Sequence, residues 1–380
     1  MSIKLGEICR FQSGGTPSKG NKAYYNGSIP WITTTALTGR TINENNAVEW
    51  ITESAVKESA AKIVPTNSIM VGTRVGVGKV AINAVDMSTS QDIVSLIGID
   101  ECRWSKAFLC KFILSKSAFL NSQARGATIK GIKIDILSAL ELPNISLYEQ
   151  EHISHVIDVV MHLIFSRKQQ LAALDELIKA RFIELFGDIT ETVPLSYYIS
   201  ALSAGKSLAG EEECSNKVLK TGAATYDYFD PTQIKNLPVD YEPQEEHRVN
   251  TGDVIISRMN TSELVGAAAY VWEAPECTYL PDRLWRAEIK DTACPIFVWQ
   301  VLIQSSTKES IRRIASGTSG SMKNISKPGL LGIRVKKVPL ELQQQFAAFV
   351  DQVDKSKFVV QKALDEAQTL FDSLMQQYFG

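Results

Sequence analysis

Residues 147–187, LYEQEHISHVIDVVMHLIFSRKQQLAALDELIKARFIELFG, carry the pattern that decides the fold. Apolar residues recur along them at spacings of three, four or seven, as on one long helix with a single buried stripe: Ile153, Ile157, Val160, Ile164, Leu171, Leu174, Ile178 and Leu185. A helix of about 40 residues is roughly 60 Å long and cannot bury such a stripe by itself. The stretch therefore predicts a partner that covers this face.

The partner is a second copy of the same pattern. Adding 193 to each number gives Phe346, Val350, Val353, Lys357, Leu364, Ala367, Phe371 and Tyr378. The opening Leu147-x-x-Gln150 returns as Leu340-x-x-Gln343, and both stretches end in Phe-Gly. We expect the two helices to pack on each other through Ile157, Val160, Ile164, Leu171, Leu174 and Ile178 of the first and Val350, Val353, Leu364 and Phe371 of the second.

Charged residues interrupt the stripe at Lys357, Arg167 and Arg181, and each has an apolar counterpart in the other copy. Such residues would fix the register and direction of pairing by disfavouring alternatives. The pattern alone therefore predicts that Lys357→Leu raises the thermal stability and makes the pairing less unique.

Composition indicates a globular, cytoplasmic protein without membrane segments. The chain has 380 residues, of which 44% are apolar and 22% charged, which suits two or three domains. No apolar run is long enough to span a bilayer, and the first residues include Glu7, where a signal peptide would be apolar. The six cysteines form no Cys-x-x-Cys pair, so we expect free thiols and no metal site.

Positive charge recurs in phase with the repeat. The net charge of −2 at first argues against a nucleic-acid partner. However, residues 102–134 contain seven bases and no acid, and residues 292–337 contain eight bases and one acid. A basic segment that returns before each long helix indicates two equivalent contacts with a polyanion.

The remaining residues form two heads, so that the chain divides into 1–143, 144–187, 188–337 and 338–380. The first head is expected to be mixed α/β, with strands at 69–71 and 75–82 and a helix at 108–120. The basic loop at 317–325 aligns with the loop at 124–132 at the same offset, whereas the head bodies share only a skeleton. Two related but unlike heads suit two unlike halves of one double-stranded target.

The order of head, long helix, head and long helix, together with the following motifs, resembles the specificity subunit of type I restriction-modification systems: Gly14-Gly15-Thr16-Pro17-Ser18, Ile29-Pro30-Trp31-Ile32 and the two Leu-x-x-Gln openings. The resemblance implies an α/β protein with two target-recognition domains and an antiparallel coiled coil that measures their spacing. It also implies a non-catalytic, DNA-binding subunit whose partners are double-stranded DNA, two modification (methyltransferase) subunits with S-adenosylmethionine, and restriction/translocase subunits with ATP and magnesium. The second head departs from the pattern, since it has Ser203-Ala204-Gly205-Lys206-Ser207 near the place of the glycine-rich opening.

Two alternatives stay open, a self-contained DNA methyltransferase or nuclease and a coiled-coil protein adaptor. The chain has no Pro-Pro pair for the Asn/Asp-Pro-Pro loop of an adenine methyltransferase. Asp282 and Glu288 resemble a nuclease motif, but on one strand they would lie about 20 Å apart, too far to share a magnesium ion. His152, His155 and His162 lack a fourth ligand for a metal.

Polar loop residues between strands are the candidates for DNA contact, because their side chains can reach base edges or phosphates. They are Thr34, Thr35, Arg74 and Lys79 in the first head, and Arg258, Asn260 and Thr261 in the second. Lys130 and Lys323, which the repeat matches, are predicted phosphate contacts.

Overall fold

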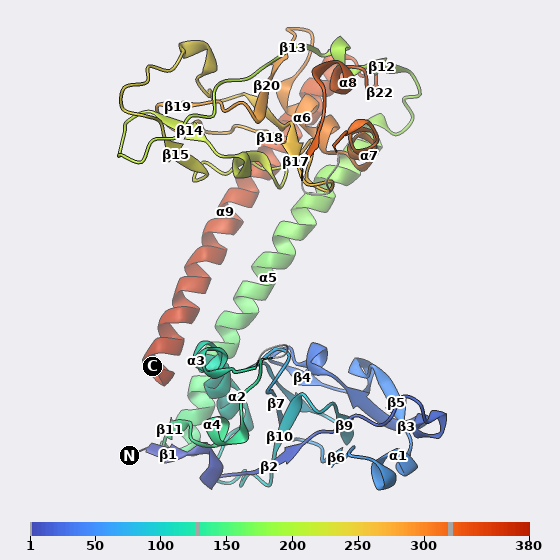
Figure 1. The fold of residues 1–380 in the computed structure, drawn as a ribbon, viewed down its shortest axis with the longest axis vertical. Coiled ribbons are helices and arrows are strands. Elements are labelled where there is room, and N and C mark those ends of the chain that lie inside the picture. Colours follow the sequence, from blue (N-terminus) through green and yellow to red (C-terminus); the bar gives the residue numbers. More distant parts are fainter. Residues whose placement is uncertain (1, 127–129, 318–321) are drawn as a thin grey trace. The chain divides into compact units, whose positions relative to one another are not determined.

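The structure is a computed structural model that describes residues 2–126, 130–317 and 322–380. It divides into two compact units, one of residues 1–169 with 361–380 and one of residues 170–360 (Figure 1). Each unit holds one α/β head and a segment of both long helices, so the predicted fold class is confirmed. In the described part of the chain, no helix has the length and apolar character needed to cross a membrane.

The two long helices, α5 (Leu147–Phe186) and α9 (Leu340–Phe379), begin and end at equivalent positions, and each has 40 residues. Ser146 and Glu149 start α5 with a reciprocal capping pair, in which the Ser146 N–H donates to the Glu149 carboxylate at 3.0 Å and the Glu149 N–H donates to the Ser146 hydroxyl at 3.3 Å. The hydrogen bonds that the Ser146 hydroxyl and the Ser146 N–H donate to the Glu149 carboxylate lower the pKa of Glu149. The repeat read from the sequence is therefore a repeat of whole elements.

Two main sheets build the first head. The five-stranded sheet is antiparallel except for β4 beside β8, and its order is β2 (Arg10–Ser13), β10 (Ile93–Ile97), β7 (Ile69–Gly72), β8 (Val80–Asn83) and β4 (Thr41–Ile42). The four-stranded sheet has the order β5 (Glu49–Ile51), β3 (Tyr25–Ile32), β9 (Met87–Thr89) and β6 (Ile63–Val64). A short pair joins β1 (Ser2–Lys4) to β11 (Glu141–Pro143), and the helices are α1 (Glu53–Glu58), α2 (Lys106–Ser115), α3 (Ser117–Gln123) and α4 (Ile134–Ser138).

Two expected elements of the first head differ in their bounds. The expected helix at 108–120 is two helices, because the chain breaks at Lys116 between α2 and α3. The expected strand at 75–82 begins only at Val80, because Gly76 and Gly78 adopt positive φ angles of 70° and 81° and form a turn.

The second head repeats the scheme with other lengths. Its four-stranded sheet has the order β13 (Ile199–Ser203), β20 (Leu284–Ile289), β16 (Val254–Ser257) and β18 (Ala268–Tyr270). Its three-stranded sheet has the order β15 (Ile234–Asn236), β14 (Lys217–Leu219) and β19 (Thr278–Tyr279). Two short pairs, β12 (Thr192–Pro194) with β22 (Arg334–Lys336) and β17 (Met259–Asn260) with β21 (Lys323–Asn324), and the helices α6 (Pro295–Ile303), α7 (Ser305–Ile314) and α8 (Lys327–Leu331) complete it.

Short 3-10 helices join these elements in both heads. They are Leu5–Glu7, Lys22–Tyr24, Thr34–Ala36, Glu44–Asn46, Leu195–Tyr197, Thr221–Ala224 and Glu245–His247.

Each head shares its hydrophobic core with both long helices. In the first unit, Ile153 and Ile157 near the start of α5 and Phe379 at the end of α9 belong to one core. In the second unit, Phe186 at the end of α5 and Phe346 near the start of α9 belong to another. The helix segments therefore run antiparallel within each unit, and each core contains residues of one head and of both helices.

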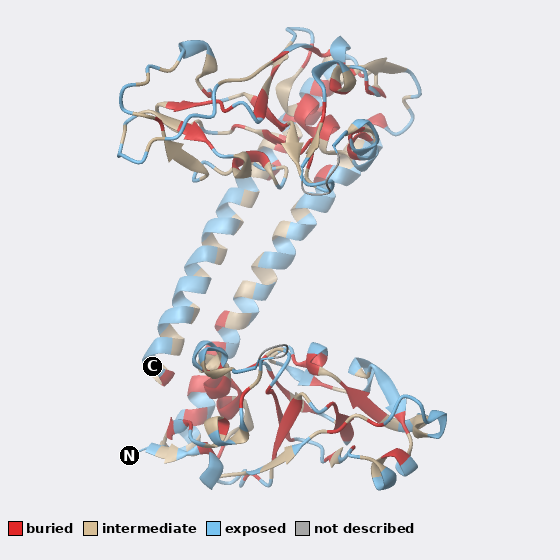
Figure 2. Cartoon of the chain, viewed as in Figure 1, coloured by how far each residue is buried: buried red, intermediate tan, exposed pale blue. Residues whose placement is uncertain are grey.

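The residues expected in the helix pairing are all at least partly buried. Ile157, Val160, Ile178, Val350 and Val353 are buried, and Ile164, Leu171, Leu174, Leu364 and Phe371 are partly buried. Figure 2 shows that full burial on both helices is confined to the portions that enter a head.

Candidate nucleic-acid interface

In the first head, two loops named from the sequence lie side by side. The Thr73 N–H, after β7, donates to the Asp92 carbonyl at 2.8 Å, and the Ile132 N–H donates to the Thr73 carbonyl at 2.8 Å. A Cβ on Gly131 would lie only 2.9 Å from Cγ of Arg74. The structure therefore brings Arg74 against the segment that follows Lys130, and both side chains are exposed.

The glycines of the loop at 72–79 approach the protein itself. A Cβ on Gly78 would lie 2.9 Å from Cα of Ser117 in α3. The Ser117 hydroxyl donates to the Gly78 carbonyl at 3.1 Å, and the Asn121 amide donates to the Val77 carbonyl at 3.0 Å. Helix α3 thus holds the loop that carries Arg74 and the exposed Lys79.

The second head makes the same connections. The Arg258 N–H, after β16, donates to the Arg283 carbonyl at 3.1 Å, and the Ile325 N–H donates to the Arg258 carbonyl at 3.1 Å. Asn260 and Lys323 are paired directly in the β17–β21 ladder. Arg258, Asn260 and Lys323 therefore gather in one place, next to Thr261, which is exposed.

These backbone hydrogen bonds show which residues of the two heads occupy equivalent positions. Arg258 occupies the position of Thr73, one residue before Arg74. By the same bonds, Arg283 occupies the position of Asp92. In the first head Asp92 pairs with Arg74 at 3.9 Å, whereas in the second head the equivalent residue is a cation.

The two threonines named in the first head differ in access. Both lie in the 3-10 helix Thr34–Ala36, where Thr34 is 5% exposed and Thr35 is exposed. The Thr35 hydroxyl is 2.8 Å from that of Thr33. In this conformation only Thr35 has a side chain that DNA could reach, whereas the side chain of Thr34 is buried.

Arg258 has an unused donor. Its Nε is buried and has no hydrogen-bond partner among the described residues, and its guanidinium carbon lies 6.0 Å from the ring centre of Trp285. Buried polar groups in native proteins are nearly always hydrogen-bonded. The Nε of Arg258 is therefore an unsatisfied buried donor in this conformation.

The acids of the nuclease-like stretch have separate partners. The Asp282 carboxylate accepts from the Ser207 hydroxyl, and the Glu288 carboxylate accepts from Ser203 at 2.5 Å and from Nε of Arg286 at 3.1 Å. Among the described residues, no group of three or more His, Cys, Asp or Glu side chains could hold a metal ion.

The cysteines are free thiols in the structure. Burial raises the pKa of Cys9 and of Cys110 to about 12, so both thiols are protonated at neutral pH.

Comparison with known proteins finds similarity to subunits of type I restriction enzymes. Residues 1–176 match the family model of the type I restriction modification DNA specificity domain. The chain is 30% identical over 184 residues to the Type I restriction enzyme MjaIX specificity subunit of Methanocaldococcus jannaschii, an alignment that covers 48% of this chain and 42% of the relative. It is 29% identical over 197 residues to the EcoR124I/EcoR124II specificity subunit of Escherichia coli, covering 50% of this chain and 48% of that one.

The first 176 residues carry a type I DNA specificity domain, and the chain is similar to type I specificity subunits. Its alignments with these two curated relatives span about half of their length. The fold is similar over the whole chain to the crystal structure of a type I restriction-modification S subunit from M. genitalium, with a TM-score of 0.62 at 16% identity and 96% of that chain covered. It is also similar to a chain from a structure of complex assembly in the type I R-M system, with a TM-score of 0.57 at 16% identity and 97% of that chain covered.

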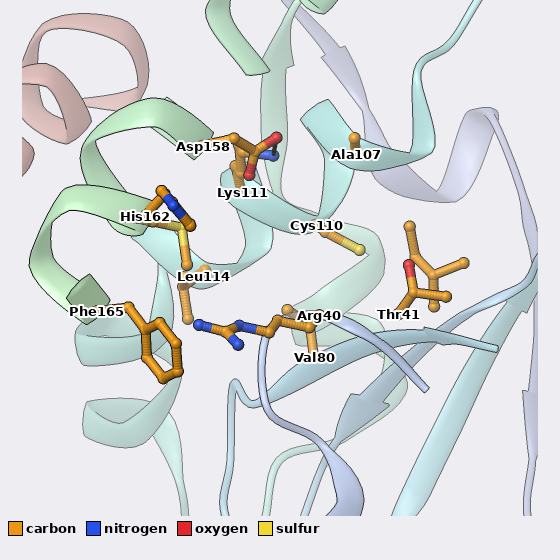
Figure 3. Close-up of a pocket in the computed structure, with 13 residues that line it drawn as sticks. Arg40, Thr41, Val80, Ala107, Cys110, Lys111, Leu114, Asp158, His162 and Phe165 are labelled. Carbon is orange, nitrogen blue, oxygen red and sulfur yellow. Dashed lines mark hydrogen bonds and ion pairs between the residues drawn. The ribbon is translucent and has the colours of Figure 1, made fainter. Parts of the chain in front are cut away.

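A cavity of about 460 Å³ in the first head lies where α2 faces α5 (Figure 3). Lys111, 9% exposed at its side chain, pairs with Asp158 at 2.9 Å, and Arg40 lies 4.4 Å from the ring centre of Phe165. In the second head Trp299 of α6 stands at the position of Cys110, counting from the helix N-caps Ser105 and Cys294.

Proposed function

We propose that this protein is the sequence-specific DNA-recognition subunit of a type I restriction-modification complex and has no catalytic activity of its own. Each head reads one half of a split site in double-stranded DNA, and the paired helices set the spacing between the halves. Two modification subunits carry S-adenosylmethionine and methylate adenine, and restriction/translocase subunits bring ATP and magnesium. The cofactors bind these partners, and the complex acts on DNA in the cytoplasm.

The observation that carries the proposal is the recurrence of one loop arrangement in both heads. In each head, a backbone carbonyl in the loop after a central strand accepts a hydrogen bond from the basic loop before the long helix. The acceptor and donor are Thr73 and Ile132 in the first head, and Arg258 and Ile325 in the second. The side chains on these loops are the types that contact bases and phosphates. Two such arrangements on unlike heads fit two unlike half-sites.

The helices support the docking of protein partners. Large apolar side chains lie open on both of them, including Tyr148 at 79%, Ile183 at 67%, Phe358 at 71% and Val359 at 65% exposure. Apolar residues exposed along one element are typical of a protein interface.

The test is a binding measurement on the reconstituted complex with a library of random double-stranded DNA. We expect selection of one split sequence only when the modification subunits are present, and a slope of log affinity against log salt of about −0.9 per phosphate neutralised. Mapping the methylated adenines then gives both half-sites. Thr35→Val, Arg74→Ala and Lys79→Ala should change only the first half-site, and Asn260→Ala and Thr261→Val only the second.

Two results would contradict the proposal. Methylation or cleavage of plasmid by the purified chain alone, with magnesium and S-adenosylmethionine, would show a self-contained enzyme. A DNA library that converges on nothing with all partners present would favour a coiled-coil adaptor.

A further inference from the structure

The second head contains a cavity of about 470 Å³ beside strands β14 and β15. Its lining residues are Ser207, Leu219, Lys220, Thr221, Lys235, Pro281, Asp282 and Arg283. Three of them are cations and one is an acid. The sequence patterns singled out none of the three cations.

In the part of the chain that the structure describes, Lys220, Lys235 and Arg283 have no ion-pair or hydrogen-bond partner for their side chains. Among the residues that the structure describes, no carboxylate oxygen lies within 4.0 Å of a side-chain nitrogen of Lys220, Lys235 or Arg283, and these nitrogens donate no hydrogen bond. Asp282 is bound to Ser207, whose hydroxyl also accepts from the Asp282 N–H at 3.2 Å. With three cations against one carboxylate, the lining of the cavity has a net positive charge, which attracts an anion.

A backbone hydrogen bond joins the lining of the cavity to the loop that carries Arg258. The Arg283 carbonyl accepts from the Arg258 N–H at 3.1 Å, and the buried Nε of Arg258 lacks a partner among the described residues. Beyond Arg258, Asn260 is paired with Lys323. The backbone thus links the cavity to side chains that were predicted to contact DNA.

The first head has different chemistry at the equivalent positions. Asp92 stands at the place of Arg283 and pairs with Arg74. Thr33 caps the 3-10 helix Thr34–Ala36, and Lys220 caps Thr221–Ala224, each following a strand that pairs in parallel with its neighbour. The extra cations are therefore particular to the second head.

We propose that this cavity is the base-reading site of the second head, in which Arg283 binds a guanine edge while Lys220 and Lys235 hold the flanking phosphates. The inference rests on the proposed DNA-recognition function. Arginine suits the base contact because its planar donors match O6 and N7 of guanine, and lysine suits phosphate as a mobile point charge. The second half-site should accordingly contain a guanine that Arg283 specifies.

The test uses the complex with its modification subunits and maps methylation over a random DNA library. Arg283→Ala should remove the preference for guanine at one position of the second half-site and leave the first half-site unchanged. Affinity for the preferred site should fall roughly 5- to 150-fold, the worth of a bidentate base contact. Arg283→Lys should keep the charge and weaken the preference, because an ammonium lacks the planar fork of donors.

The proposed role of the two lysines is tested by the salt dependence of binding. Lys220→Ala and Lys235→Ala should weaken binding to all sequences equally and reduce the salt slope by about 0.9 each. Lys290→Ala is the matched control, since Lys290 is an exposed lysine of the same head whose ammonium donates to the Ser196 carbonyl at 2.7 Å, outside the cavity. It should change neither specificity nor the slope by more than a fraction of this amount.

Unchanged guanine preference in a folded Arg283→Ala complex would overturn the inference, as would an effect on the first half-site. Thermal unfolding of each variant verifies folding. If the unmodified complex selects no DNA sequence, the proposed function fails instead, so the two failures are distinguishable.

Discussion

Gln150 and Gln343 show why a short motif repeats without change. Both are buried in the first turn of a long helix, with 0% and 1% exposure. Gln150 accepts from the Ser105 N–H at 2.9 Å and donates to the carbonyls of Arg103 and Ile145. Gln343 accepts from the Cys294 N–H at 2.9 Å and donates to the Val338 carbonyl. Each amide therefore ties the start of a long helix to the start of a helix in the head.

Replacing either amide should be strongly destabilising. Gln150→Leu leaves buried backbone groups without partners, at about 1–3 kcal/mol each, so we expect the free energy of unfolding of the first unit to fall by roughly 2–4 kcal/mol. Gln343→Leu should do the same to the second unit. Chemical denaturation measures both. The exposed Gln345→Leu serves as the control, and an equal loss there would contradict the assignment.

At the scale of elements, the long helices could be predicted because their information is local and periodic. Which residues of the two heads are equivalent could not be predicted, because the loops between them differ in length. Thr73 matches Arg258 at an offset of 185 residues, whereas Ile132, which is bonded to Thr73, matches Ile325 at an offset of 193. The cavity of the second head escaped prediction for a related reason. Lys220 and Arg283 lie 63 residues apart in the sequence, and only the strand order brings them together.

Lys357 is an element-scale case in which the pattern misleads. Its ammonium contacts the Asp175 carboxylate of the other helix at 2.6 Å. Burial raises the pKa of Asp354, and the nearby charge of Lys357 lowers it. An apolar residue at 357 would fit the stripe but would leave these acids without their cation. At neutral pH we therefore expect Lys357→Leu to lower the melting temperature by a few degrees at most, since such an ion pair contributes about 0.2–1 kcal/mol. This is opposite to the expectation from the pattern alone.

Asp354→Asn tests the same cluster through pH. A carboxyl whose pKa is raised by folding contributes stability at low pH, and that contribution is lost as the pH rises through the folded pKa. The variant removes this loss, so its melting temperature should exceed that of the natural protein at pH 7, with the difference disappearing in acid. Thermal unfolding across the acid-to-neutral range measures it. A difference that stays constant with pH would mean that titration of Asp354 is not its cause.

At the scale of the whole molecule, each unit is closed by residues from distant parts of the chain. In the first unit, β1 at the start of the chain pairs with β11, and the Phe379 ring at its end lies 5.3 Å from that of Phe108 and 6.0 Å from that of Phe112. The Lys116 ammonium also donates to the Phe379 carbonyl. In the second unit, Phe186 takes the same role, 5.4 Å from Phe297, and its carbonyl accepts from Lys336 at 2.6 Å. Sequence separation therefore says little about which residues stabilise which head.

Phe379→Ala should consequently damage the head that is farthest from it in sequence. Removing a buried phenylalanine costs about 3–5 kcal/mol, and the ring belongs to the core of the first unit. We expect faster hydrogen exchange, read by mass spectrometry, in α2 and α3 and no change in α6 and α7. Phe186→Ala should give the reverse.

Sequence specificity should change in the same head, because α3 holds the loop that carries Arg74. The Phe379→Ala complex should therefore lose discrimination at the first half-site before it loses discrimination at the second. Equal loosening of both heads would show that the cores are coupled, and faster exchange confined to α6 and α7 would show that the C-terminal turns stabilise the other unit.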